Sequence, residues 1–296
     1  MEKIFKQFFA NRTAVIATMH HKEKVIAPLL ERELGVKTIV TKQLDTDAFG
    51  TFTMEVERPG NQLEAARKKL AEALRQTNTT LGVASEGSFG SHPVFPLAPY
   101  NRELMLFLDR EMDIEVTGYV ANSNTNYSQK EIRSYEEAME FALAIGFPEH
   151  AVILKRVRNT SNEEVELVKG ITTESDLANA MIDLQRSNRN VTSISDCTLV
   201  IETDMRAMYN PTRMKNIKLA TEDLLEKLKS VCPKCDTPGF SLHDVKKGLP
   251  CEWCHMPTNA TLAHVYQCQK CTYVEEKQRP DGMNYADPAH CNFCNP

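Results

Sequence analysis

Four short segments decide how the last part of this chain folds: Cys232-Pro233-Lys234-Cys235, Cys251-Glu252-Trp253-Cys254, Cys268-Gln269-Lys270-Cys271 and Cys291-Asn292-Phe293-Cys294. They hold eight of the nine cysteines of the 296-residue chain. A gap of two residues lets both thiolates of a pair bind one ion from a tight turn, and two pairs complete a tetrahedral set of sulfur ligands. The sequence therefore predicts two structural zinc ions, with all eight paired cysteines as ligands.

The spacing leaves open which pairs share an ion. The second and third pairs resemble a zinc ribbon, in which two such turns are joined by a β-hairpin, and the first and fourth would then form an outer site. In the sequential alternative the first pair joins the second, and the third joins the fourth. Either way we expect a double zinc-ribbon domain over residues 231–296, after an α/β domain over residues 1–230.

The composition is that of a globular protein, with 42% apolar and 25% charged residues. No segment approaches the roughly 20 apolar residues of a membrane span, so we expect no membrane association. Lys3 and Lys6 interrupt the short apolar start, which is a poor signal peptide. We therefore expect a cytoplasmic protein, in which reduced thiols favour metal binding over disulfides.

The charge balance disfavours a general nucleic-acid binder, because the net charge is −5. From Cys232 onward the tail has six Lys and Arg against seven Asp and Glu residues. Each zinc ion bound by four thiolates adds two negative charges. Non-specific nucleic-acid binding through phosphate neutralisation is thus not expected.

Residues 1–230 alternate between strand and helix patterns, which favours an α/β fold: a mixed central sheet with helices on both faces. Strands are predicted at 14–18, 36–41, 81–85, 103–108, 114–121, 151–157, 165–170 and 198–203, and helices at 24–34, 61–76, 135–145, 173–187 and 211–229. Residues 86–93 are predicted to be a glycine-rich loop.

Polar residues after the predicted strands are the candidate ligand-binding residues. His20, His21 and Lys22 lie between the first strand and a helix start, a position that suits phosphate. The loop that contains Asp47 and Glu57 is rich in carboxylates and could bind Mg²⁺. Both segments could equally be solvated surface loops.

The next helix and strand add further candidates. Arg67 falls at the edge of the apolar stripe formed by Leu63, Ala66, Leu70 and Leu74, where it either pairs with a structural carboxylate or borders an anion site. Glu86 follows an apolar strand and could be a metal ligand or a general base.

Ser88 and His92 lie in the glycine-rich segment after Glu86, where backbone N–H groups could face an anion. Farther along, Arg206, Asn210 and Arg213 gather between a strand and a helix. Arginine forks bind phosphate or carboxylate, but these residues could instead form an internal ion-pair network that docks the last helix.

Several stretches together resemble an uncharacterised bacterial family of unknown function with a C-terminal double zinc ribbon. They are LGVASEGSFGSHPVFP (81–96), ETDMRAMYNPTRMKNI (202–217), GLPCEWC (248–254) and CNFCNP (291–296). The resemblance covers most of the chain and implies no established activity.

Residues 14–220 are also similar in element order to the inosine/xanthosine triphosphatase fold. The matching segments are 66–73, 84–87, 151–157 and 206–209, while residues 91–99 and the cysteine-rich tail depart from it. This similarity implies that Lys22 and Arg67 contact phosphates, that Glu57 and Glu86 hold Mg²⁺, and that water attacks a nucleotide phosphoanhydride.

Two functional hypotheses follow. The first is a metal-dependent hydrolase that acts on a nucleotide or a related phosphorylated small molecule, with Glu86, Glu57 and Asp47 as catalytic residues. The second is a non-enzymatic module that binds a ligand and docks a protein partner through the zinc ribbons.

Overall fold

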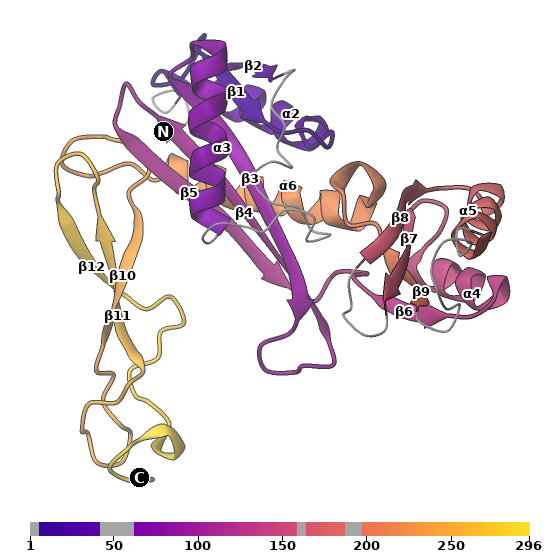
Figure 1. Ribbon diagram of the computed structural model, residues 1–296. Coiled ribbons are helices and arrows are strands. Elements are labelled where there is room, and N and C mark those ends of the chain that lie inside the picture. The colour runs from indigo at the N-terminus through magenta and orange to yellow at the C-terminus, as the bar shows by residue number, and fades with distance from the viewer. Residues whose placement is uncertain (1–5, 42–61, 159–163, 187–196) are drawn as a thin grey trace.

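The computed structural model describes residues 6–41, 62–158, 164–186 and 197–296, and its strands form three sheets (Figure 1). The first two sheets and their helices make up the α/β part, up to Lys229. The third sheet extends away from it and leads to the end of the chain (Figure 1). No helix among the described residues is both long and apolar enough to cross a bilayer.

The first sheet has five strands in the order β2-β1-β3-β4-β5. Strands β2, β1 and β3 are parallel, and β3, β4 and β5 are antiparallel, so the sheet is mixed. The bounds are β1 Thr13–Ala17, β2 Lys37–Val40, β3 Leu81–Ser91, β4 Pro99–Asp109 and β5 Ile114–Asn122.

Helices cover both faces of this sheet. Helix α3 (Gln62–Thr77) packs Leu70 and Leu74 on one face, against side chains such as Val15 and Leu106. Helices α2 (Glu23–Leu34) and α6 (Pro211–Lys229) pack on the opposite face. Because apolar side chains repeat every three or four residues in each helix, each helix presents one continuous apolar stripe to the sheet.

The second sheet has four strands, in the order β6-β9-β7-β8, and is antiparallel in each pair. It consists of β6 Gln129–Ile132, β7 Val152–Arg158, β8 Glu164–Ile171 and β9 Cys197–Thr203. Helices α4 (Tyr135–Ile145) and α5 (Glu174–Arg186) pack on it and form a separate apolar core. Ser134 caps α4 by accepting a hydrogen bond from Glu137 N, and Gly146 ends it in a left-handed conformation.

The third sheet consists of β10 (Ser241–Lys247), β11 (Thr261–Gln267) and β12 (Val274–Gln278), all antiparallel. It is anchored to β5 at one end, where Glu115 N donates to Gln269 Oε1 at 2.8 Å and Gln269 Nε2 donates to Glu115 O at 2.6 Å. Its other end lies far from the α/β part (Figure 1).

The predicted mixed α/β class, with helices on both faces of a sheet, is confirmed. The strands expected in one central sheet instead divide between two, because local apolar patterns identify strands but not their partners. The predicted loop at 86–93 is wrong over residues 86–91: β3 continues to Ser91, paired with Pro99–Leu104.

Gly118 in β5 allows α6 to approach the sheet closely. A methyl group at this position would contact the Ala220 carbonyl oxygen and lie 2.6 Å from Leu224 N. We expect Gly118→Ala to lower the free energy of unfolding by about 3 kcal/mol, at the upper end of typical overpacking costs. Chemical denaturation would measure the change. Gly90→Ala is the matched control, since nothing lies within 4 Å of the added atom; equal effects of the two would contradict the packing argument.

Candidate functional site

Five charged side chains are buried around the point where β1 ends and β3 continues. This charge cluster consists of Lys22, Lys69, Glu86, Glu103 and Arg213, each no more than 7% exposed. They come from α2's N-terminal cap, α3, β3, β4 and α6, so the fold brings together residues almost 200 positions apart. Charged side chains are seldom buried without partners, because desolvation is costly.

The charge cluster contains two ion pairs, and its third basic residue bonds a neighbouring serine. Lys22 Nζ donates to Ser85 Oγ at 2.9 Å, and Lys69 forms an ion pair with Glu86. Arg213 Nε donates to Glu103 Oε1 at 2.8 Å. Two carboxylates therefore face three cations.

Gly87 makes room for this arrangement. A methyl group at Gly87 would lie 2.6 Å from both Arg213 Nη2 and Glu103 Oε1. A glycine within a strand often marks such a close approach. In the sequence Gly87 indicates a loop, but in the structure it lies within β3, where the close packing of Arg213 and Glu103 leaves no room for a side chain.

Lys22 has an unusual protonation equilibrium. Burial, reinforced by the nearby positive charges of Arg213 and Lys69, lowers its pKa from 10.5 to about 7. The carboxylates of Glu103 and Glu86 oppose this shift but do not cancel it. Lys22 therefore changes charge near neutral pH.

Several of the buried polar atoms without a hydrogen-bond partner in the described residues lie in the same region. They include Thr18 Oγ1, just after β1, both side-chain amide atoms of Asn101, and Glu103 Oε2. Asn101 is fully buried and lies two residues from Glu103, on the same face of β4. Such atoms in a folded protein call for an explanation, since nearly all buried polar groups are paired.

The structure brings three of the predicted ligand-binding or catalytic residues together, namely Lys22, Glu86 and Arg213. Lys69 and Glu103 were not identified from the sequence. Lys69 could have been found on a helical wheel: the buried row of α3 includes Ala65, Lys69 and Ala73, at steps of four residues. Glu103 carries no comparable signal, because alternation alone does not say which face of β4 is buried.

Arg67 is not part of the charge cluster. Of the two alternatives predicted for Arg67, the structure shows pairing with a carboxylate: the side chain is 51% exposed and bonds both carboxylate oxygens of Glu115. Glu115 pairs with Leu108, whereas Glu86 pairs with Leu104. Four residues along β4 correspond to about 13 Å.

His20, His21, Ser88 and His92, also predicted to bind a ligand, do not belong to the charge cluster. His20 is half-buried, and His21 is exposed and contacts Glu23 at 3.3 Å. Ser88 is half-buried, two residues beyond Glu86 in β3. His92 lies at the tip of the β3–β4 hairpin, where its Nδ1 accepts from Val94 N and Phe95 N, so it organises the turn.

Arg206 and Asn210 have structural contacts. Arg206 forms an ion pair with Asp204, and its guanidinium lies 4.7 Å from the Tyr209 ring centroid. Asn210 caps α6 by accepting from Arg213 N at 2.9 Å, and its amide donates to Asn126 Oδ1. These contacts agree with the alternative of a network that docks the last helix.

Asp47 and Glu57, expected to bind Mg²⁺ or take part in catalysis, lie outside the described residues. Within those described, the groups of side chains that could hold a metal ion are two sets of four cysteines. The proximal cluster contains Cys232, Cys235, Cys268 and Cys271, and the distal cluster contains Cys251, Cys254, Cys291 and Cys294.

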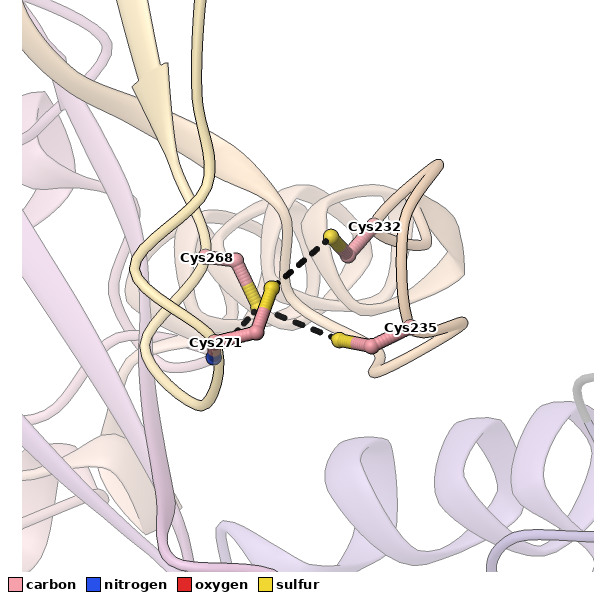
Figure 2. Close-up of side chains that lie close together, drawn as sticks. All are labelled: Cys232, Cys235, Cys268 and Cys271. Carbon is pink, nitrogen blue, oxygen red and sulfur yellow. Dashed lines mark hydrogen bonds between the residues drawn. The ribbon is translucent and has the colours of Figure 1, made fainter.

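In the proximal cluster two turns face each other beside the end of α6, with their sulfur atoms toward a common centre (Figure 2). The Sγ atoms of Cys232 and Cys271 are 3.6 Å apart, as are those of Cys235 and Cys268. In the distal cluster the corresponding distances are 3.8 and 3.6 Å. Zinc–sulfur bonds of about 2.3 Å place tetrahedral ligands about 3.8 Å apart, so both clusters fit zinc.

The cysteine pairs alternate between the clusters: the first joins the third, and the second joins the fourth. Both predicted arrangements, nested and sequential, are therefore wrong. The third sheet explains the result. Antiparallel β10 and β11 connect the two ends of the unit, so successive pairs come to lie at opposite ends (Figure 1).

The fold and these clusters define a mixed α/β protein with a cysteine-rich module suited to two metal ions. The family model described as a domain of unknown function, DUF6671, matches residues 69–296, which is more than three quarters of the chain. The protein therefore belongs to this family. No curated protein matches the chain.

The alternating arrangement predicts a specific pattern of zinc loss. Replacing the second and fourth pairs together by serine should leave one zinc ion per chain, because the proximal cluster keeps all four ligands. Replacing the second and third pairs should remove both ions, because each cluster loses half its ligands. Metal analysis of the purified variants would measure this. The reverse result would restore the nested pairing, and loss of both ions from both variants would point to the sequential one.

The lowered pKa of Lys22 predicts a pH effect on stability. Between pH 7 and 9 the folded protein has neutral Lys22 while the unfolded chain keeps the proton, so stability should rise with pH. The free energy of unfolding of the wild type should gain about 2–3 kcal/mol relative to Lys22→Met over this range. Chemical denaturation at several pH values would measure it, and parallel pH curves would contradict the shift.

Proposed function

We propose that the α/β part binds a phosphorylated small molecule at the charge cluster. The observation that carries this proposal is the unequal burial of charge: Lys22, Lys69 and Arg213 against Glu86 and Glu103. With Lys22 protonated, the five side chains carry one excess positive charge. Burying an excess charge is unfavourable, and an anionic ligand would neutralise it.

The surrounding groups support a phosphate as this anion. Protonated Lys22 supplies a compact cation, and the Asn101 amide supplies a buried donor with no partner among the described residues. A phosphate oxygen accepts hydrogen bonds from both types of group. Because a bound anion would favour protonated Lys22, whose pKa is about 7, the affinity should fall as the pH rises above 7.

Hydrolysis of a phosphate ester or anhydride is the reaction class we propose for this site. Glu86 supplies a carboxylate among the cations that would hold the phosphate, where it could accept a proton from an attacking water. In this reaction Mg²⁺ would be bound by the phosphates of the ligand, because the described residues contain no cluster of carboxylates that could hold it. A non-enzymatic ligand-binding module is the alternative.

Binding can be tested with the full-length protein and inorganic phosphate, pyrophosphate and ATP. We expect at least one of them to raise the melting temperature of the wild type, and Lys22→Met and Lys69→Met to abolish the shift. Lys68→Met is the matched control, because Lys68 is the exposed neighbour of Lys69 on α3. If no anion stabilises the wild type, or if the three variants respond alike, the cluster is a structural ion network.

Turnover needs a separate test. A panel of nucleoside triphosphates with Mg²⁺ would be assayed for released phosphate and pyrophosphate. General base removal typically costs about 10²–10⁴-fold in rate, so Glu86→Gln should lose most of the activity while retaining ligand-induced stabilisation. Stabilisation without any turnover in the wild type would favour the binding module.

Both cysteine clusters are proposed to hold structural zinc, because complete sets of four thiolates leave no open coordination position. Eight thiols that must stay reduced support a cytoplasmic location.

A further inference from the structure

The two zinc clusters differ at one repeated position. The third residue of each Cys-x-x-Cys turn is lysine in the proximal cluster (Lys234 and Lys270) and aromatic in the distal cluster (Trp253 and Phe293). Trp253 is 75% exposed and Phe293 is 60% exposed. Exposed apolar patches often mark interaction sites.

Further apolar side chains extend this surface, which we call the distal tip (residues 249–259 and 282–296). Met256, Met283 and Tyr285 are each between 42% and 49% exposed. A backbone β-bridge between Cys251 and Ala286 joins the two segments. The ring centroids of His255 and Tyr285 lie 5.8 Å apart. The distal tip is the end of the third sheet that points away from the α/β part (Figure 1).

The charge of the distal tip has one sign. Its two segments contain Glu252 and Asp287 and no lysine or arginine. Four thiolates around one zinc ion add two further negative charges. The surface is therefore both aromatic and anionic.

We infer that the distal tip docks a lysine- or arginine-rich segment of another protein. A second copy of this tip would bring equal negative charges together, and nucleic acids and anionic membranes are repelled for the same reason. A basic segment matches the charge of Glu252 and Asp287, and its cations can stack on the exposed aromatic rings. Aliphatic stems of lysine or arginine cover the remaining apolar surface.

Trp253 supplies a direct readout, because it is the only tryptophan in the chain. The probe is an eight-residue peptide of alternating arginine and alanine, titrated into the full-length protein with zinc bound. We expect a saturable change in tryptophan fluorescence that weakens as salt is raised. The same peptide with glutamate in place of arginine should produce no change.

Variants locate the binding surface. Phe293→Lys gives the distal turn the lysine found at the same position of the proximal turns. The distal cluster should therefore still bind zinc, and measuring the zinc content of the variant would verify this. We expect this variant, and Glu252→Gln with Asp287→Asn, to bind the arginine peptide at least tenfold more weakly, consistent with the loss of about 1.4 kcal/mol or more.

Leu97→Ala is the matched control, since Leu97 is a fully exposed apolar residue on the β3–β4 hairpin, outside the distal tip. It should bind like the wild type. The inference is overturned if the arginine peptide does not change the fluorescence, if the glutamate peptide acts equally, or if zinc-loaded Phe293→Lys binds normally.

Discussion

The ion pair between Arg213 and Glu103 is the interaction on which the arrangement of this protein depends. Both side chains are essentially removed from water, so loss of either partner would leave an uncompensated buried charge at a cost of about 3–5 kcal/mol. Gly87 leaves the space in which the pair forms. The pair fixes the first turn of α6 against β4, and the rest of the helix then lies across the sheet and leads directly to the proximal cluster.

The same helix start holds the second sheet in place. Asn210 caps α6 and bonds Asn126, while Arg213 Nη1 donates to the Met205 carbonyl at 2.5 Å. Polar groups at the start of α6 thus connect the two apolar cores. The closely spaced Asn210 and Arg213, which the sequence suggests as ligand-binding residues, therefore have structural contacts at the start of α6.

Local patterns in the sequence were sufficient for most helices and strands, for the caps around α4 and for the eight cysteines that form the two clusters. They were insufficient wherever distant partners decide the outcome. Glycines and serines after Glu86 indicate a loop, yet they continue a strand because β4 pairs with them and Arg213 needs the space. Arg67 and Lys69 are two positions apart, and tertiary packing determines that Lys69 reaches the buried Glu86 while Arg67 pairs with Glu115 nearer the surface. The pairing of cysteines is equally non-local, since it depends on the direction of β10 and β11.

The alternation of cysteine pairs has a consequence for synthesis on the ribosome. During synthesis, the first and second cysteine pairs leave the ribosome before the third pair has been made. The loop between the first and second pairs is about half as long as the 33-residue separation of Cys235 and Cys268. A loop of half the length costs about 0.6 kcal/mol less to close, so a zinc ion captured early would favour the wrong partners. After such a capture, the pairing of β11 with β10 would have to exchange one pair of thiolates around the ion before the alternating clusters could form.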